Sequence, residues 1–165
     1  MLNHVLTALQ TSSLAAAVRG EFGWDWLFPN IETIHVIAVA TLFGSIAMVD
    51  LRLVGVVGRR SSVSDLAAEY LPITWTAFGV AVIAGSMMFI SRAQTYFHNP
   101  QFEMKFVCMG LAGLNMLVFH LGAYRYVGRW DRQLPPPWTA RVAGGLSLLL
   151  WIGVIFFGRW TGFTT

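Results

Sequence analysis

The sequence predicts an all-α integral membrane protein, a bundle of four transmembrane helices with an N-terminal amphipathic helix at the membrane interface. The chain is 56% hydrophobic and only 12% charged, with a mean hydropathy of +0.60. A soluble domain carries about 25% charged residues, so this composition indicates lipid as the surrounding solvent. The apolar residues are concentrated in four long runs, each close to the roughly 20 residues that a bilayer-crossing helix needs. With 165 residues, we expect a single membrane domain over 1–165.

The N-terminal segment, residues 1–18, differs from the four runs. Its apolar residues recur at helical spacing, but it is too short and too polar to span a bilayer. We therefore expect an amphipathic helix that lies at the interface. Trp24, Trp26 and Phe28 follow it and suit the headgroup region, where a ring has one apolar and one wet end.

The four spans are expected at about 31–57, 72–91, 105–124 and 141–159. Pro29 precedes the first span, and Ser64 or Asp65 is the expected cap of the segment after it. Pro72 is expected to bend the chain into the second span. Along that span, small residues recur every four positions, a pattern that favours close helix packing in lipid, at Ala77, Ala81 and Gly85.

The basic residues predict how the bundle is oriented. Seven of the 11 fall near the two connections after the first and third spans: Arg52, Arg59, Arg60, Arg125, Arg129, Arg132 and Arg141. The other four belong to the opposite side: Arg19, Arg92, Lys105 and Arg159. Because basic residues favour the cytoplasmic side, we expect both termini on the outside. Scattered in this way, they do not indicate a nucleic-acid partner.

One cysteine excludes several kinds of site. Cys108 has no partner for an intrachain disulfide, and one cysteine cannot form a zinc, iron–sulfur or covalent haem-attachment motif.

Polar groups within the spans are functional candidates, because they are costly in lipid. Counting depth along antiparallel helices groups Glu32, His35, Lys105 and loop residue His98 near the outer surface. The same counting groups Asp50, Arg52 and His120 near the inner surface.

These depths limit how a haem could be held. His120 lies 15 residues beyond Lys105, or about 22 Å deeper at 1.5 Å per residue, so His35 and His120 are too far apart to share one iron. A single haem b near the outer side fits, with His35 as one ligand and Lys105, His98, water or nothing as the second. Simpler roles stay open: an interhelical hydrogen bond for His35, a headgroup contact for Lys105, and a topology-fixing pair for Asp50 and Arg52.

The whole chain resembles an uncharacterised family of small four-helix bacterial membrane proteins. The resemblance rests on the stretches 32–35 (Glu-Thr-Ile-His), 50–53 (Asp-Leu-Arg-Leu), 99–102 with Lys105, and 113–115 with His120. It implies a multi-pass protein of the bacterial cytoplasmic membrane, with both termini then periplasmic.

A more distant resemblance concerns the first span. The segment 35–43 is similar to the first helix of HemJ-type haem-b protoporphyrinogen oxidases, and copper-resistance D-type membrane domains look related. In the HemJ-type family, a histidine near the outer end of helix 1 and a lysine at the start of helix 3 are implicated in haem binding. His35 and Lys105 occupy the matching positions. This chain departs from that family at Asp50, where proline is usual.

The leading hypothesis is a haem-b-binding membrane protein with a redox or electron-transfer role. Whether it is also an enzyme, a haem-dependent membrane oxidoreductase, stays open. Glu32 would accept a hydrogen bond from His35 or handle a proton. The inner set, Asp50, Arg52 and His120, would exchange protons or bind a quinone headgroup, and a quinone or a redox protein is the expected partner. The alternatives are a non-catalytic accessory subunit of a larger membrane complex, a homo-oligomer, and a small transporter.

Overall fold

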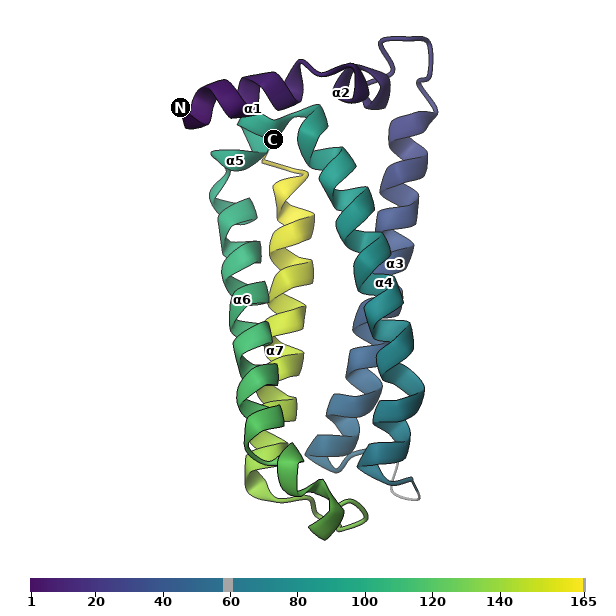
Figure 1. The fold of residues 1–165 in the computed structure, drawn as a ribbon, viewed down its shortest axis with the longest axis vertical. Coiled ribbons are helices and arrows are strands. Elements are labelled where there is room, and N and C mark those ends of the chain that lie inside the picture. Colours follow the sequence, from purple (N-terminus) through teal and green to yellow (C-terminus); the bar gives the residue numbers. More distant parts are fainter. Residues whose placement is uncertain (58–60, 165) are drawn as a thin grey trace.

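The computed structural model describes residues 1–57 and 61–164, and those residues form helices and connections without a strand. Four long helices run side by side (Figure 1): α3 (Leu27–Val54), α4 (Val63–Ser91), α6 (Pro100–Leu121) and α7 (Trp138–Thr161). Each is long and apolar enough to cross a membrane. The prediction of an all-helical chain with four apolar spans is confirmed, and the chain has the character of a multi-pass membrane protein.

Both termini lie at the same end of the bundle, as expected (Figure 1). There α1 (Leu2–Gln10) and α2 (Ser13–Val18) lie across the ends of the long helices, so residues 1–18 form two helices rather than one. Arg19 fastens them, because its guanidinium donates to the carbonyls of Gln10 and Ser91 at 2.7 and 3.0 Å. The short α5 (Ala93–Phe97) underlies α1.

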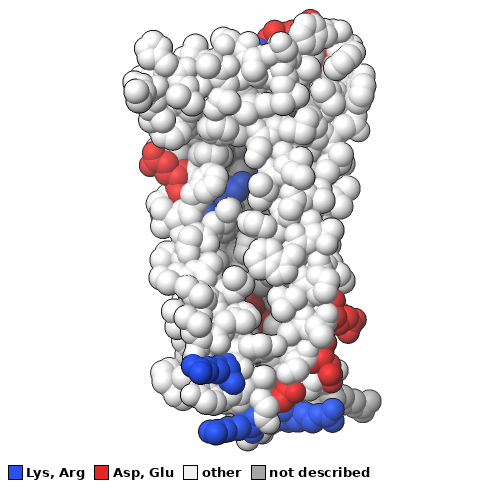
Figure 2. All heavy atoms as spheres, in the orientation of Figure 1, with Lys and Arg blue, Asp and Glu red and all other residues white. Residues whose placement is uncertain are grey.

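Most charged side chains visible in Figure 2 lie toward the end opposite the termini, and the rest of the visible face is mostly uncharged, with one basic and a few acidic groups. Basic side chains are concentrated at the end opposite the termini, where the 3₁₀ helix η1 (Tyr124–Arg129) and the α3–α4 connection lie. A face with so few charges is compatible with contact to lipid. The assignment of the termini to the periplasm stays a prediction, and Arg59 and Arg60 lie outside the described residues.

Several helix ends differ from the sequence-based expectation. The first span begins at Leu27 with Pro29 inside its first turn, where a main-chain N–H has no helical acceptor and a proline is tolerated. The second span does not start at Pro72, because α4 continues through that residue as one helix of 29 residues. Its cap is Ser62, whose Oγ accepts from the Asp65 N–H at 3.0 Å, and not Ser64 or Asp65.

The packing leaves the bundle open on one side. α3 packs along α4, and α7 packs on both α3 and α6. By contrast, α6 makes few close contacts with α3 or α4, apart from the stacked rings of Phe89 and Phe102 at 5.5 Å. Small residues permit the close contacts: Ala77 and Ala81 of α4 are buried, and a Cβ at Gly144 of α7 would lie 2.8 Å from the Asp50 carbonyl oxygen. The predicted small-residue stripe is therefore used inside the bundle.

Candidate functional site

The outer candidate site is built around His35, about two turns into α3 on the face toward α4. Its ring Nδ1 lies 2.9 Å from the carbonyl oxygen of Ala81. The ring rests against Gly85, where a Cβ would come within 2.9 Å of the imidazole Cε1 and 3.3 Å of Nδ1. Only glycine leaves space for the imidazole at this position in α4, so the His35 ring is held by both its hydrogen bond and its packing.

The hydrogen bond decides which ring nitrogen is free. A carbonyl oxygen only accepts, so Nδ1 carries the proton, and in the neutral imidazole Nε2 then keeps its lone pair. Among the described residues no group hydrogen-bonds to Nε2, and Nε2 is not one of the buried unpartnered atoms. Nε2 is thus accessible and able to bind a metal. The main-chain carbonyl of Ala81, and not the Glu32 carboxylate as expected, orients the ring.

Lys105 belongs to the same outer region, as predicted from depth. It is half-buried in α6, and its side chain lies along α7, with Nζ 4.0 Å from where a Cβ of Gly158 would stand. Its charge and that of the exposed Glu32 both act on the His35 imidazole. In the described ranges, 1–57 and 61–164, Lys105 makes no hydrogen bond or ion pair.

The α5 segment adds a tyrosine to this end of the bundle. Burial raises the pKa of the Tyr96 phenol, Arg92 opposes that rise and the Glu32 charge adds to it. The ring of Tyr96 packs on Phe89 and Phe102. Tyr96 therefore lies near Glu32, a neighbour that sequence spacing did not indicate.

His98 is exposed at the end of α5. Its Nδ1 donates to the Gln94 carbonyl oxygen at 2.9 Å, and its ring packs edge-on against Phe97. The structure gives no contact between His98 and His35. Of the two side-chain candidates for a second ligand, Lys105 is the one whose charge reaches the His35 ring.

The inner polar residues line a cavity of about 300 Å³ between all four long helices. Asp50 is 7% exposed and its Oδ2 has no hydrogen-bond partner within the described part of the chain. Ser147 of α7 lies beside its carboxyl group. His120 and Asn115 of α6 also line the cavity. Figure 2 shows a hollow on this face of the molecule, with a basic side chain higher up and an acidic one lower down.

Arg52 does not join this cavity. It is fully buried, and its Nε and Nη2 donate to the main-chain oxygens of Ser61 and Asp131 at 3.0 and 3.1 Å. Asp50 and Arg52 lie two positions apart on α3, so they point to different faces. Arg52 therefore links the α3–α4 connection to the α6–α7 connection. It forms no ion pair with Asp50 in the described structure.

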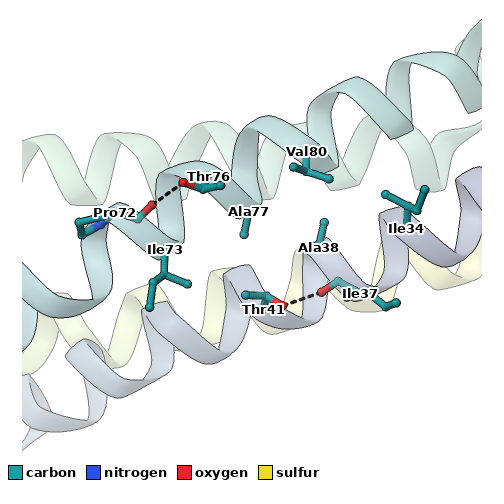
Figure 3. Close-up of a pocket in the computed structure, with 9 residues that line it drawn as sticks. All are labelled: Ile34, Ile37, Ala38, Thr41, Pro72, Ile73, Thr76, Ala77 and Val80. Atoms are coloured by element: carbon teal, nitrogen blue, oxygen red, sulfur yellow. Dashed lines mark hydrogen bonds between the residues drawn. The ribbon is translucent and has the colours of Figure 1, made fainter.

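A groove separate from the inner cavity lies between α3 and α4, on the outside of the bundle (Figure 3). It has a volume of about 500 Å³ and is lined mostly by aliphatic side chains. Its two hydroxyls, on Thr41 and Thr76, donate to carbonyls of their own helices at 2.9 Å. With no free polar group, this groove offers no chemistry, and we place the functional site inside the bundle.

These observations define a class: a small four-helix membrane protein with two polar sites at different depths in an apolar bundle. Residues 23–164 match the model of a family of unknown function, DUF6644, and the chain belongs to that family. Comparisons with the curated proteins and with the solved structures found no match. The resemblance to an uncharacterised family is thereby confirmed, while nothing supports the more distant one to HemJ-type oxidases or copper-resistance D-type domains.

The structure also shows site residues that sequence analysis missed. Ser147 and Gly85 belong to helices whose pattern appeared purely structural, and only packing reveals their neighbours. In the described part of the chain, no three His, Cys, Asp or Glu residues cluster as a metal site would require. A metal bound by protein ligands alone is thus not indicated there, whereas a haem needs only axial ligands.

Proposed function

We propose that this protein binds haem b near the outer end of the bundle and serves in membrane redox chemistry or electron transfer, with His35 as an axial ligand. The observation that carries the proposal is the 2.9 Å hydrogen bond from Nδ1 to the Ala81 carbonyl, which leaves Nε2 accessible. Histidine ligands in metal sites are commonly held this way, since the second nitrogen fixes ring orientation and tautomer.

The surroundings of His35 fit this role. Because Gly85 has no side chain, the His35 ring can pack against α4. In the same way, Gly158 leaves room for the Lys105 side chain along α7. α4 and α6 make few close main-chain contacts, although the rings of Phe89 and Phe102 stack between the two helices at the outer end, with centroids 5.5 Å apart. When bound, a haem would supply one-electron redox chemistry. The protein would hold it, orient the ligand and set the surrounding charge.

Lys105 is the proposed second ligand or, if protonated, a partner for an anionic group. It needs to lose a proton before it can ligate iron. Glu32 is exposed and close enough for its charge to act on His35, so it is placed to exchange protons with the aqueous side. The accessory-subunit alternative is supported less well, because the small residues of α4 that could pack on a partner's helix, Ala77 and Ala81, are buried inside the bundle.

The test is the haem content of the purified full chain after expression with a haem precursor. We expect bound haem in the wild type and in His4→Ala, whose histidine is exposed on α1. We expect its loss in His35→Ala, with partial return when imidazole is added. Lys105→Met should keep haem and change the spectrum if Lys105 ligates. Full haem content with an unchanged spectrum in His35→Ala would refute the proposal.

A further inference from the structure

We infer that the inner cavity around Asp50 is a binding site for a lipid-soluble aromatic alcohol of the hydroquinone class. The inference stands on that cavity alone and does not depend on the haem proposal, because neither His35 nor Lys105 lines it. Three features of the cavity carry the inference: its polarity gradient, its acceptor groups and its opening.

The polar residues of the lining lie in the inner part of the cavity, and its outer part is lined by apolar side chains. Asp50 lies near the inner end of α3, and Asn115, His120 and Ser147 lie in the corresponding halves of α6 and α7. Apart from Thr74, whose hydroxyl donates to the Tyr70 carbonyl, the rest of the lining is apolar and includes the aromatic rings of Trp75, Phe78, Phe119 and Trp151. Such a site suits a molecule with a small polar ring and an apolar body, and its volume of about 300 Å³ is that of a small ligand pocket.

The polar end offers acceptors. Asp50 Oδ2 is buried and has no partner in the described ranges. His120 donates from Nδ1 to the Met116 carbonyl at 2.9 Å, so the neutral ring keeps a lone pair on Nε2. Asn115 donates an amide N–H to the Ala143 carbonyl at 2.9 Å, and its Oδ1 remains an acceptor. Acceptors on two helices are complementary to a ligand with two hydroxyl donors, which a hydroquinone has and a quinone lacks.

The opening favours a ligand that arrives through the membrane. The lining residues of α4 and α6 face each other without close packing between the two helices. Trp75 on α4 and Met116 on α6 remain exposed, at 57% and 42%, although both line the cavity. A molecule dissolved in lipid can therefore enter from the side. A buried carboxylate also suits an organic cation, but a cation does not need the two neutral acceptors.

The experiment measures binding of decylubiquinol to the full chain in lipid nanodiscs, by quenching of tryptophan fluorescence. Two of the seven tryptophans, Trp75 and Trp151, line the cavity. We expect saturable quenching, with decylubiquinol bound about tenfold more tightly than decylubiquinone, the effect of about one hydrogen bond. Asp50→Asn replaces an acceptor by an amide that can donate, so it should abolish this preference, whereas Asp65→Asn, at an exposed position, should not.

A second pair of variants tests the space itself. Gly113 lines the cavity, and a Cβ there meets nothing within 4 Å, so Gly113→Leu fills the cavity without disturbing α6. Gly110 on the same helix is equally free of neighbours and does not line the cavity. Gly113→Leu should abolish saturable quenching, and Gly110→Leu should leave it unchanged.

Three results would overturn the inference. One is the absence of saturable quenching by decylubiquinol in wild-type protein that elutes as a folded species. Another is unchanged binding in Gly113→Leu. The third is saturable binding of tetraphenylphosphonium, lost in Asp50→Asn, without binding of decylubiquinol, which would make the cavity a cation site.

Discussion

The close contact between His35 and Gly85 gives a sharp prediction for the variant Gly85→Ala. The new Cβ would stand 2.9 Å from the imidazole Cε1 and 3.3 Å from Nδ1, closer than carbon atoms approach in a packed interior. The ring or helix α4 must move, and the hydrogen bond from Nδ1 to the Ala81 carbonyl lengthens or breaks. The one added methyl group therefore acts directly on the orientation of His35.

Two effects of opposite sign set the magnitude. Overpacking of this kind costs about 1–3 kcal/mol, while alanine is favoured over glycine in a helix by about 1 kcal/mol. In the wild type we expect Gly85→Ala to lower the free energy of unfolding by about 0–2 kcal/mol. In the His35→Ala background the clash is absent, so the same change should raise it by about 1 kcal/mol. The coupling between the two positions is then about 1–3 kcal/mol.

The assay is a double-mutant cycle on the free energy of unfolding, followed by circular dichroism in mixed detergent micelles. Gly79→Ala serves as the control, because a Cβ at Gly79 of α4 meets nothing within 4 Å. It should be stabilising in both backgrounds. Additivity of Gly85→Ala and His35→Ala within about 0.5 kcal/mol would refute the packing of the His35 ring against Gly85.

Two further predictions concern the inner half of the bundle. Arg52→Met should destabilise the protein by about 2–4 kcal/mol, because it leaves the carbonyls of Ser61 and Asp131 without their charged donor; a thermal midpoint equal to that of the wild type would contradict this. Gly144→Ala should destabilise by about 1–3 kcal/mol, since the new Cβ would stand 2.8 Å from the Asp50 carbonyl oxygen and push α7 from α3; unchanged unfolding, compared with Gly145→Ala, where nothing lies within 4 Å, would contradict that close approach.

Sequence patterns predicted the number and character of the long helices because hydropathy over about 20 residues is a strong signal. They failed at the helix ends, where single contacts decide. Pro29 and Pro72 appeared to be boundaries, yet a proline in the first turn is harmless, and an apolar helix of the kind that spans a membrane tolerates one inside it. Ser62 caps α4, although Ser64 and Asp65 are residue types that cap helices equally well.

Sequence analysis predicted how far along the bundle each candidate residue lies, but not which residues it contacts. Counting 1.5 Å per residue was enough to place Lys105 near His35. It could not show that Arg52 points away from Asp50 to the loops, since that depends on the chain around Asp131, 79 residues away. Nor could it show that a carbonyl of α4, rather than Glu32, holds the His35 ring, because the neighbouring helix supplies that contact.

The most direct measurement is a dithionite-reduced minus oxidised absorption spectrum of the detergent-purified wild-type chain, expressed with a haem precursor. We expect a Soret band together with α and β bands, at a haem-to-protein ratio near one, since the proposal gives the bundle one haem site, at His35. A spectrum without these bands, from protein that is folded by circular dichroism, would contradict the assignment of His35 as a haem ligand.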